Sequence, residues 1–251
     1  MSPAFKRVAM VTGAAGGLGS AVVQLLAKSG HDLAIVDLAA EGLTALEKEL
    51  GSQGSKIESL PADLAQVSEC ERVVAHTIDK FGRLDILVNS AAILARAELD
   101  DVTAESFDKV FHVNARAPFF LMRAAMRDMV KRNWGRIVNV TSFGVYQGGE
   151  KITSAPYEAT KGAVSVFTKM FAKFGAANGV LVNAVCPGAM KTQMILDGTP
   201  KEILDGICNA TPLKRIADPV EVARTIVWLC GEENSFSTGA TFDVGGGWGI
   251  H

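Results

Sequence analysis

The sequence predicts a single α/β domain whose core is a doubly wound parallel sheet with helices on both faces. Short apolar runs alternate with helical patterns from one end of the chain to the other. The runs are mostly apolar rather than strictly alternating, which is typical of parallel strands that are buried on both faces. No Pro/Ser-rich linker, repeat or block of like charge interrupts the alternation, so residues 1–251 are interpreted as one domain.

The elements follow one another in strand–helix order. Six apolar runs are predicted as strands: residues 8–11, 33–36, 57–60, 84–88, 136–140 and 180–185. The helical patterns between them cover residues 20–28, 42–50, 67–79 and 104–131, and a fifth helix runs from Tyr157 to about residue 177. A shorter helical stretch begins at Pro200. Each strand is thus followed by a helix that can return the chain to the same edge of a parallel sheet.

Composition excludes several classes of function. The 251 residues include 48% hydrophobic residues and carry a formal net charge of −2, which provides no long-range attraction to nucleic acid or to an anionic membrane. The four cysteines are scattered without CxxC spacing, so no metal site or disulfide framework is predicted. No signal peptide or bilayer-spanning stretch is recognised, and a cytoplasmic protein is expected.

A glycine-rich turn follows the first strand. It runs from Thr12 to Gly19 and contains Gly13, Gly17 and Leu18. Glycine allows the backbone to turn tightly and to approach a pyrophosphate, whose charge the N-terminus of the next helix can hold. An ordinary strand-to-helix turn is the alternative, but the position between a strand and a helix favours nucleotide binding.

Asp37 ends the second strand, eighteen residues beyond Gly19. A carboxylate at this point can accept hydrogen bonds from both hydroxyls of an adenosine ribose and would repel a 2′-phosphate. Leu38 follows it, and no Lys or Arg lies between Gly13 and Gly19 to neutralise such a phosphate. The sequence therefore favours NAD over NADP as the cofactor.

Tyr157 and Lys161 are separated by four residues in a predicted helix, so they share a face with about 6 Å of rise between them. A nearby ammonium lowers the pKa of a phenol, as a general acid/base for alcohol–ketone chemistry requires. Ser142 follows the fifth strand at its carboxyl end, where it could donate to a substrate carbonyl or be a simple turn serine. Asn114 could kink the long helix or form a buried hydrogen-bonding link.

Residues 188–215 form the least regular part of the chain and contain Pro200 and Pro212. A long connection inside a compact domain is usually functional, so this segment is predicted to be a lid over the substrate. A poorly ordered surface insertion is the alternative.

Taken together, these motifs resemble those of the short-chain dehydrogenase/reductase family over essentially the whole chain, and the fold that this resemblance implies is Rossmann-like. Beyond the turn and the Tyr157–Lys161 pair, the matching residues include the sequence Val182 to Gly188 and the C-terminal sequence Asp243 to Gly246. The resemblance implies four catalytic residues: Asn114, Ser142, Tyr157 and Lys161. It implies cofactor contacts at Gly13, Gly17, Leu18, Gly19, Asp37, Leu38, Asp63, Leu64, Asn89, Ala91, Tyr157, Lys161, Pro187, Gly188 and Thr192.

The roles that the resemblance implies are specific. Tyr157 would be the acid/base, Lys161 would lower its pKa and bind the nicotinamide ribose, and Ser142 would polarise the substrate oxygen. Asn114 would hold a water that links Lys161 to solvent. The helices over residues 104–131 and after Lys161 would pack against a second subunit in a homotetramer.

The resulting prediction is an oxidoreductase that transfers a hydride between NAD(H) and a small-molecule secondary alcohol or ketone. A 3-oxoacyl-thioester reductase of the acyl-carrier-protein type is one alternative, and a non-catalytic nucleotide-sensing or interaction protein is another. Phe143, Met190 and Met194, together with Trp248, favour a partly apolar substrate.

Overall fold

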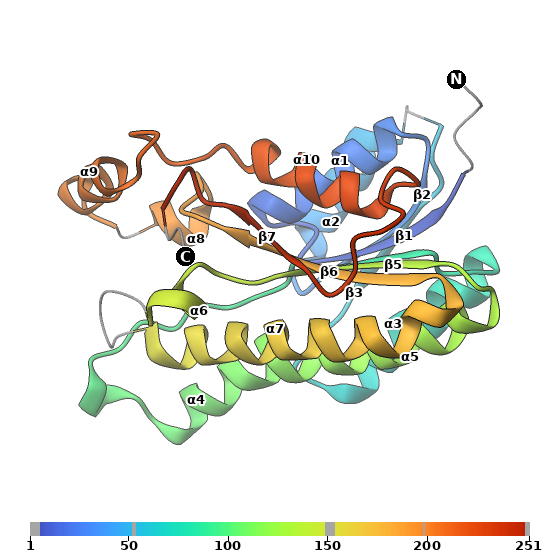
Figure 1. Cartoon of the computed structure of the whole chain (residues 1–251), viewed down its shortest axis with the longest axis horizontal. Coiled ribbons are helices and arrows are strands. Elements are labelled where there is room, and N and C mark those ends of the chain that lie inside the picture. Colours follow the sequence, from blue (N-terminus) through green and yellow to red (C-terminus); the bar gives the residue numbers. More distant parts are fainter. Residues whose placement is uncertain (1–5, 52–53, 149–153, 198, 249–251) are drawn as a thin grey trace.

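The computed structural model of the chain describes residues 6–51, 54–148, 154–197 and 199–248 (Figure 1). Across these residues seven parallel strands form one sheet in the order β3-β2-β1-β4-β5-β6-β7. The strands are β1 (Val8–Thr12), β2 (Asp32–Asp37), β3 (Ile57–Pro61), β4 (Ile86–Asn89), β5 (Gly135–Val140), β6 (Val180–Pro187) and β7 (Thr241–Val244). All six strands predicted from the apolar runs are confirmed.

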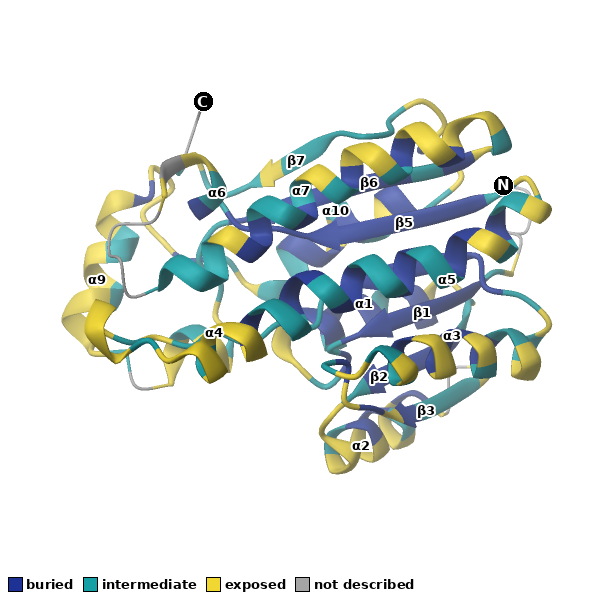
Figure 2. Ribbon diagram, turned by 90° about the horizontal axis from the view of Figure 1, so that it is seen from below, coloured by how far each residue is buried: buried dark blue, intermediate teal, exposed yellow. Residues whose placement is uncertain are grey.

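Helices cover both faces of the sheet, which confirms the predicted doubly wound α/β fold (Figure 1). One face is covered by α1 (Gly17–Lys28), α2 (Ala40–Leu50) and α10 (Pro219–Cys230). The other is covered by α3 (Val67–Phe81), α5 (Ala117–Lys131) and α7 (Ala155–Gly175), and α4 (Ala104–Phe111) packs against α7. The strands between these two layers are largely buried, as the dark blue ribbons of Figure 2 show. No helix in the described part of the chain is long and apolar enough to span a bilayer.

Helix α10 has no counterpart among the helices predicted from the sequence. Its N-terminus carries a capping box in which Asp218 and Glu221 each accept a backbone N–H of the other, with Pro219 at the first helical position. Val222, Ile226 and Leu229 follow at helical spacing and are buried. Both features are visible in the sequence and predict a helix here.

The predicted helix over residues 104–131 is divided by a π-helical turn, His112–Arg116. Pro118 lies just beyond this turn, in the first turn of α5. Proline has no N–H to donate to the carbonyl four residues earlier, and its ring displaces that carbonyl. The wider turn accommodates this break in the hydrogen-bond ladder and places Asn114 in its centre, fully buried.

The carboxyl ends of the strands carry the remaining short elements. These are α6 (Gly144–Gln147), α8 (Gln193–Leu196), α9 (Lys201–Ala210) and a 3₁₀ turn at Leu99–Asp101, whereas the 3₁₀ turn at Ala176–Asn178 precedes β6 at the opposite edge. Helix α9 projects beyond this edge of the sheet at the left of Figure 1. The functional residues predicted from the sequence are therefore collected at the edge where ligands bind in open α/β sheets.

A chain of buried side chains joins β4, β5 and α7. Asn89 Nδ2 donates to Asn139 Oδ1 at 2.8 Å, and Asn139 Nδ2 donates to Thr168 Oγ1 at 2.9 Å. The Thr168 hydroxyl in turn donates to the Val164 carbonyl at 2.8 Å. Asn139 and Thr168 are inaccessible to solvent, so these bonds have no competition from water. They fix the position of α7 on the sheet.

Replacement of Thr168 by Val tests this chain of bonds. The substitution keeps the shape of the side chain but leaves Asn139 Nδ2 without its oxygen partner. We expect Thr168→Val to lower the free energy of unfolding by about 1–3 kcal/mol, the cost of an unsatisfied buried donor, as measured by urea denaturation.

The matched control is Thr77→Val in α3. Thr77 is equally buried, and its hydroxyl donates to the carbonyl four residues earlier at 2.7 Å, as that of Thr168 does. No amide side chain donates to Thr77 among the hydrogen bonds of the described residues. An equal loss of stability in the two variants would contradict the structural role given to the Asn139–Thr168 bond.

Candidate active site

The glycine-rich turn packs closely against the chain after β4. Gly13 has a φ of 68°, and a Cβ added there would lie 2.8 Å from the Ala91 backbone. A Cβ at Gly19 would lie 2.0 Å from the Gly13 carbonyl oxygen. These contacts require glycine at both positions. Helix α1 begins at Gly17 without a side-chain cap, so its first N–H groups can receive an anion. Leu18 contributes only its backbone here, because its side chain is buried in the core.

Thr12 holds the chain after β4 in place. Its Oγ1 accepts hydrogen bonds from the Ser90 and Ala91 N–H groups, both at 3.2 Å. Asn89 is the last residue of β4, and its buried Oδ1 has no hydrogen-bond partner among the described residues. An unpaired buried acceptor is unusual, and it lies at the edge where a ribose would bind.

Asp37 joins the end of β2 to the glycine-rich turn. Its Oδ2 accepts from the Ala15 N–H and its Oδ1 from the Ala39 N–H, both at 3.0 Å. The N-cap of α2 is Ala39, so Asp37 does not cap that helix. Leu38 is 73% exposed beside it. A carboxylate and an exposed apolar surface therefore border the place where an adenosine would lie.

Asp63 and Leu64 follow β3. The Asp63 carboxylate accepts from the Ala65 N–H at 3.0 Å, and the Leu64 side chain is buried in the core. The predicted contact with adenine would therefore fall on the exposed Asp63 and on backbone atoms rather than on the Leu64 side chain.

The proposed catalytic residues converge where α7 crosses the end of β5. Ser142 lies two residues beyond this strand, is 8% exposed, and its Oγ accepts from the Gly144 N–H at 3.2 Å. Lys161 is 3% exposed and its Nζ donates to the Val140 carbonyl at 2.8 Å. The same Nζ lies 5.5 Å from the centroid of the Tyr157 ring. Two hydroxyl-bearing side chains and an amine thus share one largely buried site.

Burial dominates the electrostatics of this site. Burial and then the charge of Glu158 raise the pKa of Tyr157 above its ordinary value. Burial also lowers the pKa of Lys161 to about 8, although Glu158 acts in the opposite direction. Lys161 is not among the causes of the raised pKa of Tyr157, and its Nζ donates to the Val140 carbonyl; its implied effect on the pKa of Tyr157 remains a prediction. Tyr157 is the neutral phenol at neutral pH, the form that donates a proton.

Asn114 is held by both atoms of its amide. Its Oδ1 accepts from the Ile93 N–H at 2.9 Å and its Nδ2 donates to the Ile93 carbonyl at 2.8 Å. The side chain therefore fixes the chain beyond β4 to the π-helical turn. Its implied part in a proton relay remains a prediction.

The segment predicted to be a lid is tied down at both ends. At its start, the Gly188 N–H donates to the Val244 carbonyl at 3.1 Å and Met190 forms a β-bridge with Ala217. At its end, the Leu213 N–H donates to the Gly246 carbonyl at 3.2 Å. A Cβ added at Gly17 would lie 2.9 Å from the Thr192 methyl group, so Thr192 rests on the glycine-rich turn. Between these ends, α8 and α9 contain no buried residue.

The predicted substrate residues have different surroundings. Phe143 stacks on Trp248 with 4.4 Å between ring centroids. Met194 is 39% exposed on α8, whereas Met190 is partly buried and packs against the core. Residues 149–153 of the loop before α7 lie outside the described part of the chain.

The sequence analysis did not single out Glu158. Its carboxyl group lies against Gly144 and is close enough to Ser142 for a hydrogen bond. An acidic residue directly after the tyrosine is the only sequence signal. No cluster of three or more potential metal ligands occurs within the described residues.

Comparison with known proteins gives consistent matches over the whole chain. A family model described as Enoyl-(Acyl carrier protein) reductase matches residues 13–249. The 3-oxoacyl-(acyl-carrier-protein) reductase FabG of Thermotoga maritima is 34% identical over 242 residues, which cover 96% of this chain and 97% of that protein. A short-chain dehydrogenase/reductase of Armillaria gallica is 36% identical over 250 residues, covering 96% and 95% of the two chains.

A solved structure matches closely as well. The 3-ketoacyl-(acyl-carrier-protein) reductase from Brucella melitensis complexed with NADH superposes with a TM-score of 0.89 at 29% sequence identity. The match covers 97% of this chain and 98% of that one.

Proposed function

The chain belongs to the short-chain dehydrogenase/reductase family, and from this premise we propose that it transfers a hydride between NAD(H) and a secondary alcohol or ketone, with Tyr157 as the general acid/base. The observation that carries the proposal is the convergence of Ser142, Tyr157 and Lys161 in one buried site at the end of β5. A nucleotide-sensing protein without chemistry would not need all three.

The residues at the edge of the sheet fit a nicotinamide dinucleotide. The uncapped start of α1 and the close turn at Gly13 suit a pyrophosphate, and the unpaired Asn89 Oδ1 offers an acceptor to a ribose hydroxyl. Gly188 and Thr192 would lie at the nicotinamide end. When bound, the cofactor supplies or accepts the hydride.

The protein residues supply position and a proton. In ketone reduction, the neutral Tyr157 phenol donates its proton to the carbonyl oxygen as the carbonyl carbon gains the hydride. Ser142 donates a hydrogen bond to the same oxygen and stabilises the charge that develops there. Lys161, with its pKa lowered to about 8, can exchange a proton near neutral pH and so help to restore Tyr157.

A 3-oxoacyl-thioester reductase is the second candidate. The names of the relative from Thermotoga maritima and of the solved structure from Brucella melitensis support it. The family model bears the name of an enoyl reductase, but two hydroxyl groups at one site suit a carbonyl oxygen better than a carbon–carbon double bond. Parallel assays with a 3-oxoacyl thioester, an alicyclic ketone and an enoyl thioester, each with NADH and NADPH, separate these candidates.

Tyr157→Phe tests the acid/base assignment. Removal of the phenolic proton should lower kcat by about 10²–10⁴-fold, the usual contribution of general acid/base catalysis, and leave NADH binding nearly unchanged. Tyr146→Phe removes the only other tyrosine hydroxyl and is the control, with activity near that of the wild type. Retention of more than roughly a tenth of the activity by Tyr157→Phe would rule out this role.

Asp37 is proposed to select NAD. The double variant Asp37→Ser with Leu38→Arg removes the charge that repels a 2′-phosphate and adds one that attracts it, so kcat/KM should rise for NADPH and fall for NADH. Asp37→Asn is the control that preserves an acceptor for the Ala15 N–H and removes only the charge. A native preference for NADPH over NADH would refute the proposal.

Residues 188–215 are proposed to act as a lid, with motion confined to residues 193–210 because the flanking residues are paired with Ala217, Val244 and Gly246. Amide exchange over α8 and α9 should slow when NADH and a substrate analogue are bound, because closure excludes water. Exchange in α3, which lies elsewhere, is the internal reference. Equal exchange in α8 and α9 with and without ligands would make this segment a fixed wall.

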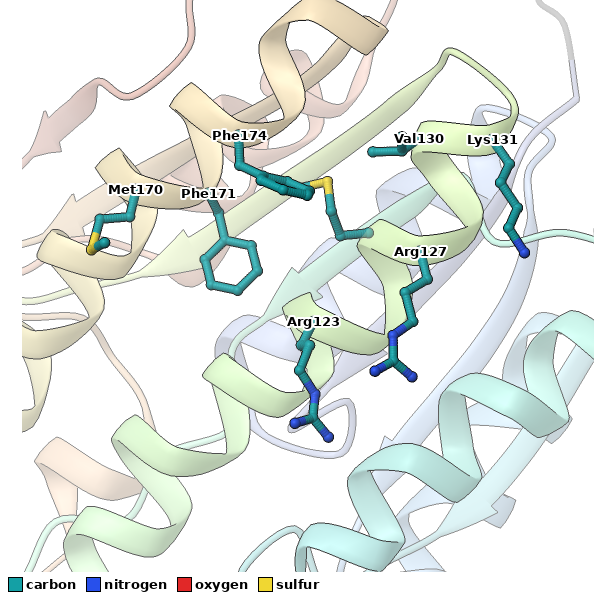
Figure 3. A pocket seen from close by; sticks show the side chains of 8 residues that line it. Arg123, Arg127, Val130, Lys131, Met170, Phe171 and Phe174 are labelled. Atoms are coloured by element: carbon teal, nitrogen blue, oxygen red, sulfur yellow. The ribbon is translucent and has the colours of Figure 1, made fainter.

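The protein is proposed to be a homotetramer. Figure 3 shows an apolar hollow between α5 and α7, into which Phe171 and Phe174 project from α7, with Arg123 and Arg127 extending from α5. Met170 and Phe174 are 64% and 69% exposed, which is unusual for such side chains on a monomer. A second subunit would cover this surface.

Light scattering should give a mass close to four times 26.5 kDa. Phe174→Glu should reduce this mass, since a buried unpaired charge opposes association. Leu99→Glu alters a residue of similar exposure outside the hollow and should leave the mass unchanged. A wild-type monomer at micromolar concentration would contradict the proposal.

A further inference from the structure

Glu158 places a carboxyl group in the catalytic cluster. It directly follows Tyr157 on α7, and its carboxyl lies against the chain that leaves β5. A Cβ added at Gly144 would lie 2.2 Å from its carboxyl carbon and from Oε2, and 2.5 Å from Oε1. Oε2 is buried and has no hydrogen-bond partner among the described residues. An ionised carboxylate with an unpaired buried oxygen is costly, and a neutral carboxylic acid costs less.

The surroundings of Glu158 act on its charge in both directions. Burial raises the pKa of this carboxyl above its ordinary value, while the hydrogen bond from Ser142 and the charge of Lys161 lower it less. Tyr157 on the same helix and Cys186 on β6 also respond to its charge. Other ionisable groups lie on the neighbouring elements but are not among the causes of the raised pKa of Glu158. They are Tyr146 on α6 and, on α4 and the π-helical turn, Glu105, Asp108, Lys109 and Arg116.

The hydroxyl of Ser142 has one hydrogen to donate and two lone pairs. The Gly144 N–H occupies one lone pair. If Glu158 is ionised, it accepts the hydrogen of Ser142, and none remains for a substrate. If Glu158 is neutral, its own O–H can occupy the second lone pair, and the Ser142 hydrogen is free for the substrate oxygen.

We propose that Glu158 is a positioning residue that directs the Ser142 hydroxyl: as a neutral acid it turns the Ser142 hydrogen toward the substrate, and as a carboxylate it turns that hydrogen away. This inference rests on the proposed carbonyl reduction at the same site. It adds a third ionisable group that controls the reaction, separate from Tyr157 and Lys161. Ketone reduction should therefore decline as pH rises through the ionisation of Glu158.

The first test compares the pH dependence of kcat for ketone reduction in the wild type and in Glu158→Gln. The amide donates to Ser142 at every pH and cannot ionise. In the wild type, kcat should begin to decline above the ordinary glutamate pKa, and this decline should be absent in Glu158→Gln. At low pH, kcat of Glu158→Gln should stay within about threefold of the wild-type value. Loss of the Ser142 hydrogen bond to the substrate would cost far more, about 10²–10³-fold. Glu105→Gln on α4 is the matched control and should retain the wild-type profile.

Gly144→Ala perturbs the same contact from the other side. Its new methyl group would overlap the Glu158 carboxyl and displace it from Ser142, so kcat should fall. In the Glu158→Ala background the space is vacant, and the same methyl group should cost much less. This pair keeps the test informative if Glu158→Gln proves unstable.

Infrared spectroscopy provides a readout that does not depend on turnover. At low pH the wild type should show a protonated-carboxyl band that Glu158→Gln lacks and Ser142→Ala shifts. An identical pH profile in wild type and Glu158→Gln, or no such band, would overturn the inference. If no ketone is reduced with either cofactor, the proposed function fails instead, and the infrared bands still decide the state of Glu158.

Discussion

The attachment of α7 to the end of β5 is the constraint on which the rest of the site depends. Two buried bonds make it: Asn139 to Thr168 at 2.9 Å and Lys161 to the Val140 carbonyl at 2.8 Å. The first continues through Asn89 to β4, so three elements that are distant in sequence are held in one register. Ser142 leaves β5 two residues beyond Val140, and Tyr157 lies one helical turn before Lys161. Their approach follows from where α7 is fixed, not from any contact between them.

This arrangement explains why burial governs the chemistry of the site. A phenol and an amine that are removed from water each favour the neutral form, so the pKa of Tyr157 rises and that of Lys161 falls to about 8. The site is thus prepared to give a proton to an oxygen, the step that ketone reduction requires. Burial has the same effect on Glu158, because it raises the pKa of the carboxyl and so favours the neutral form.

Much of the fold and the site follows from local patterns in the sequence. Three features depend on residues that are close in the chain: the apolar strands, the turn at Gly13 to Gly19 and the pair Tyr157–Lys161. The residue types at these positions are sufficient to predict their chemistry. The pattern of Asp218 and Glu221 was equally local, and helix α10 could have been predicted from it.

Other features depend on contacts that no local pattern contains. The direction of the Lys161 ammonium depends on a carbonyl twenty-one residues earlier. The contact of Thr192 with Gly17 joins opposite parts of the chain. The division of the long helix at Asn114 could have been suspected from Pro118, but the bonds that lock Asn114 to Ile93 are tertiary.

Transfer of deuterium from cofactor to product tests the central claim most directly. NADH labelled with deuterium at the reactive face of C4 should, in a single turnover with a ketone substrate, yield a secondary alcohol that carries the label on its carbinol carbon, with the hydroxyl proton taken from solvent through Tyr157. A protein that binds NADH tightly but transfers no label to any ketone or thioester substrate would contradict the account.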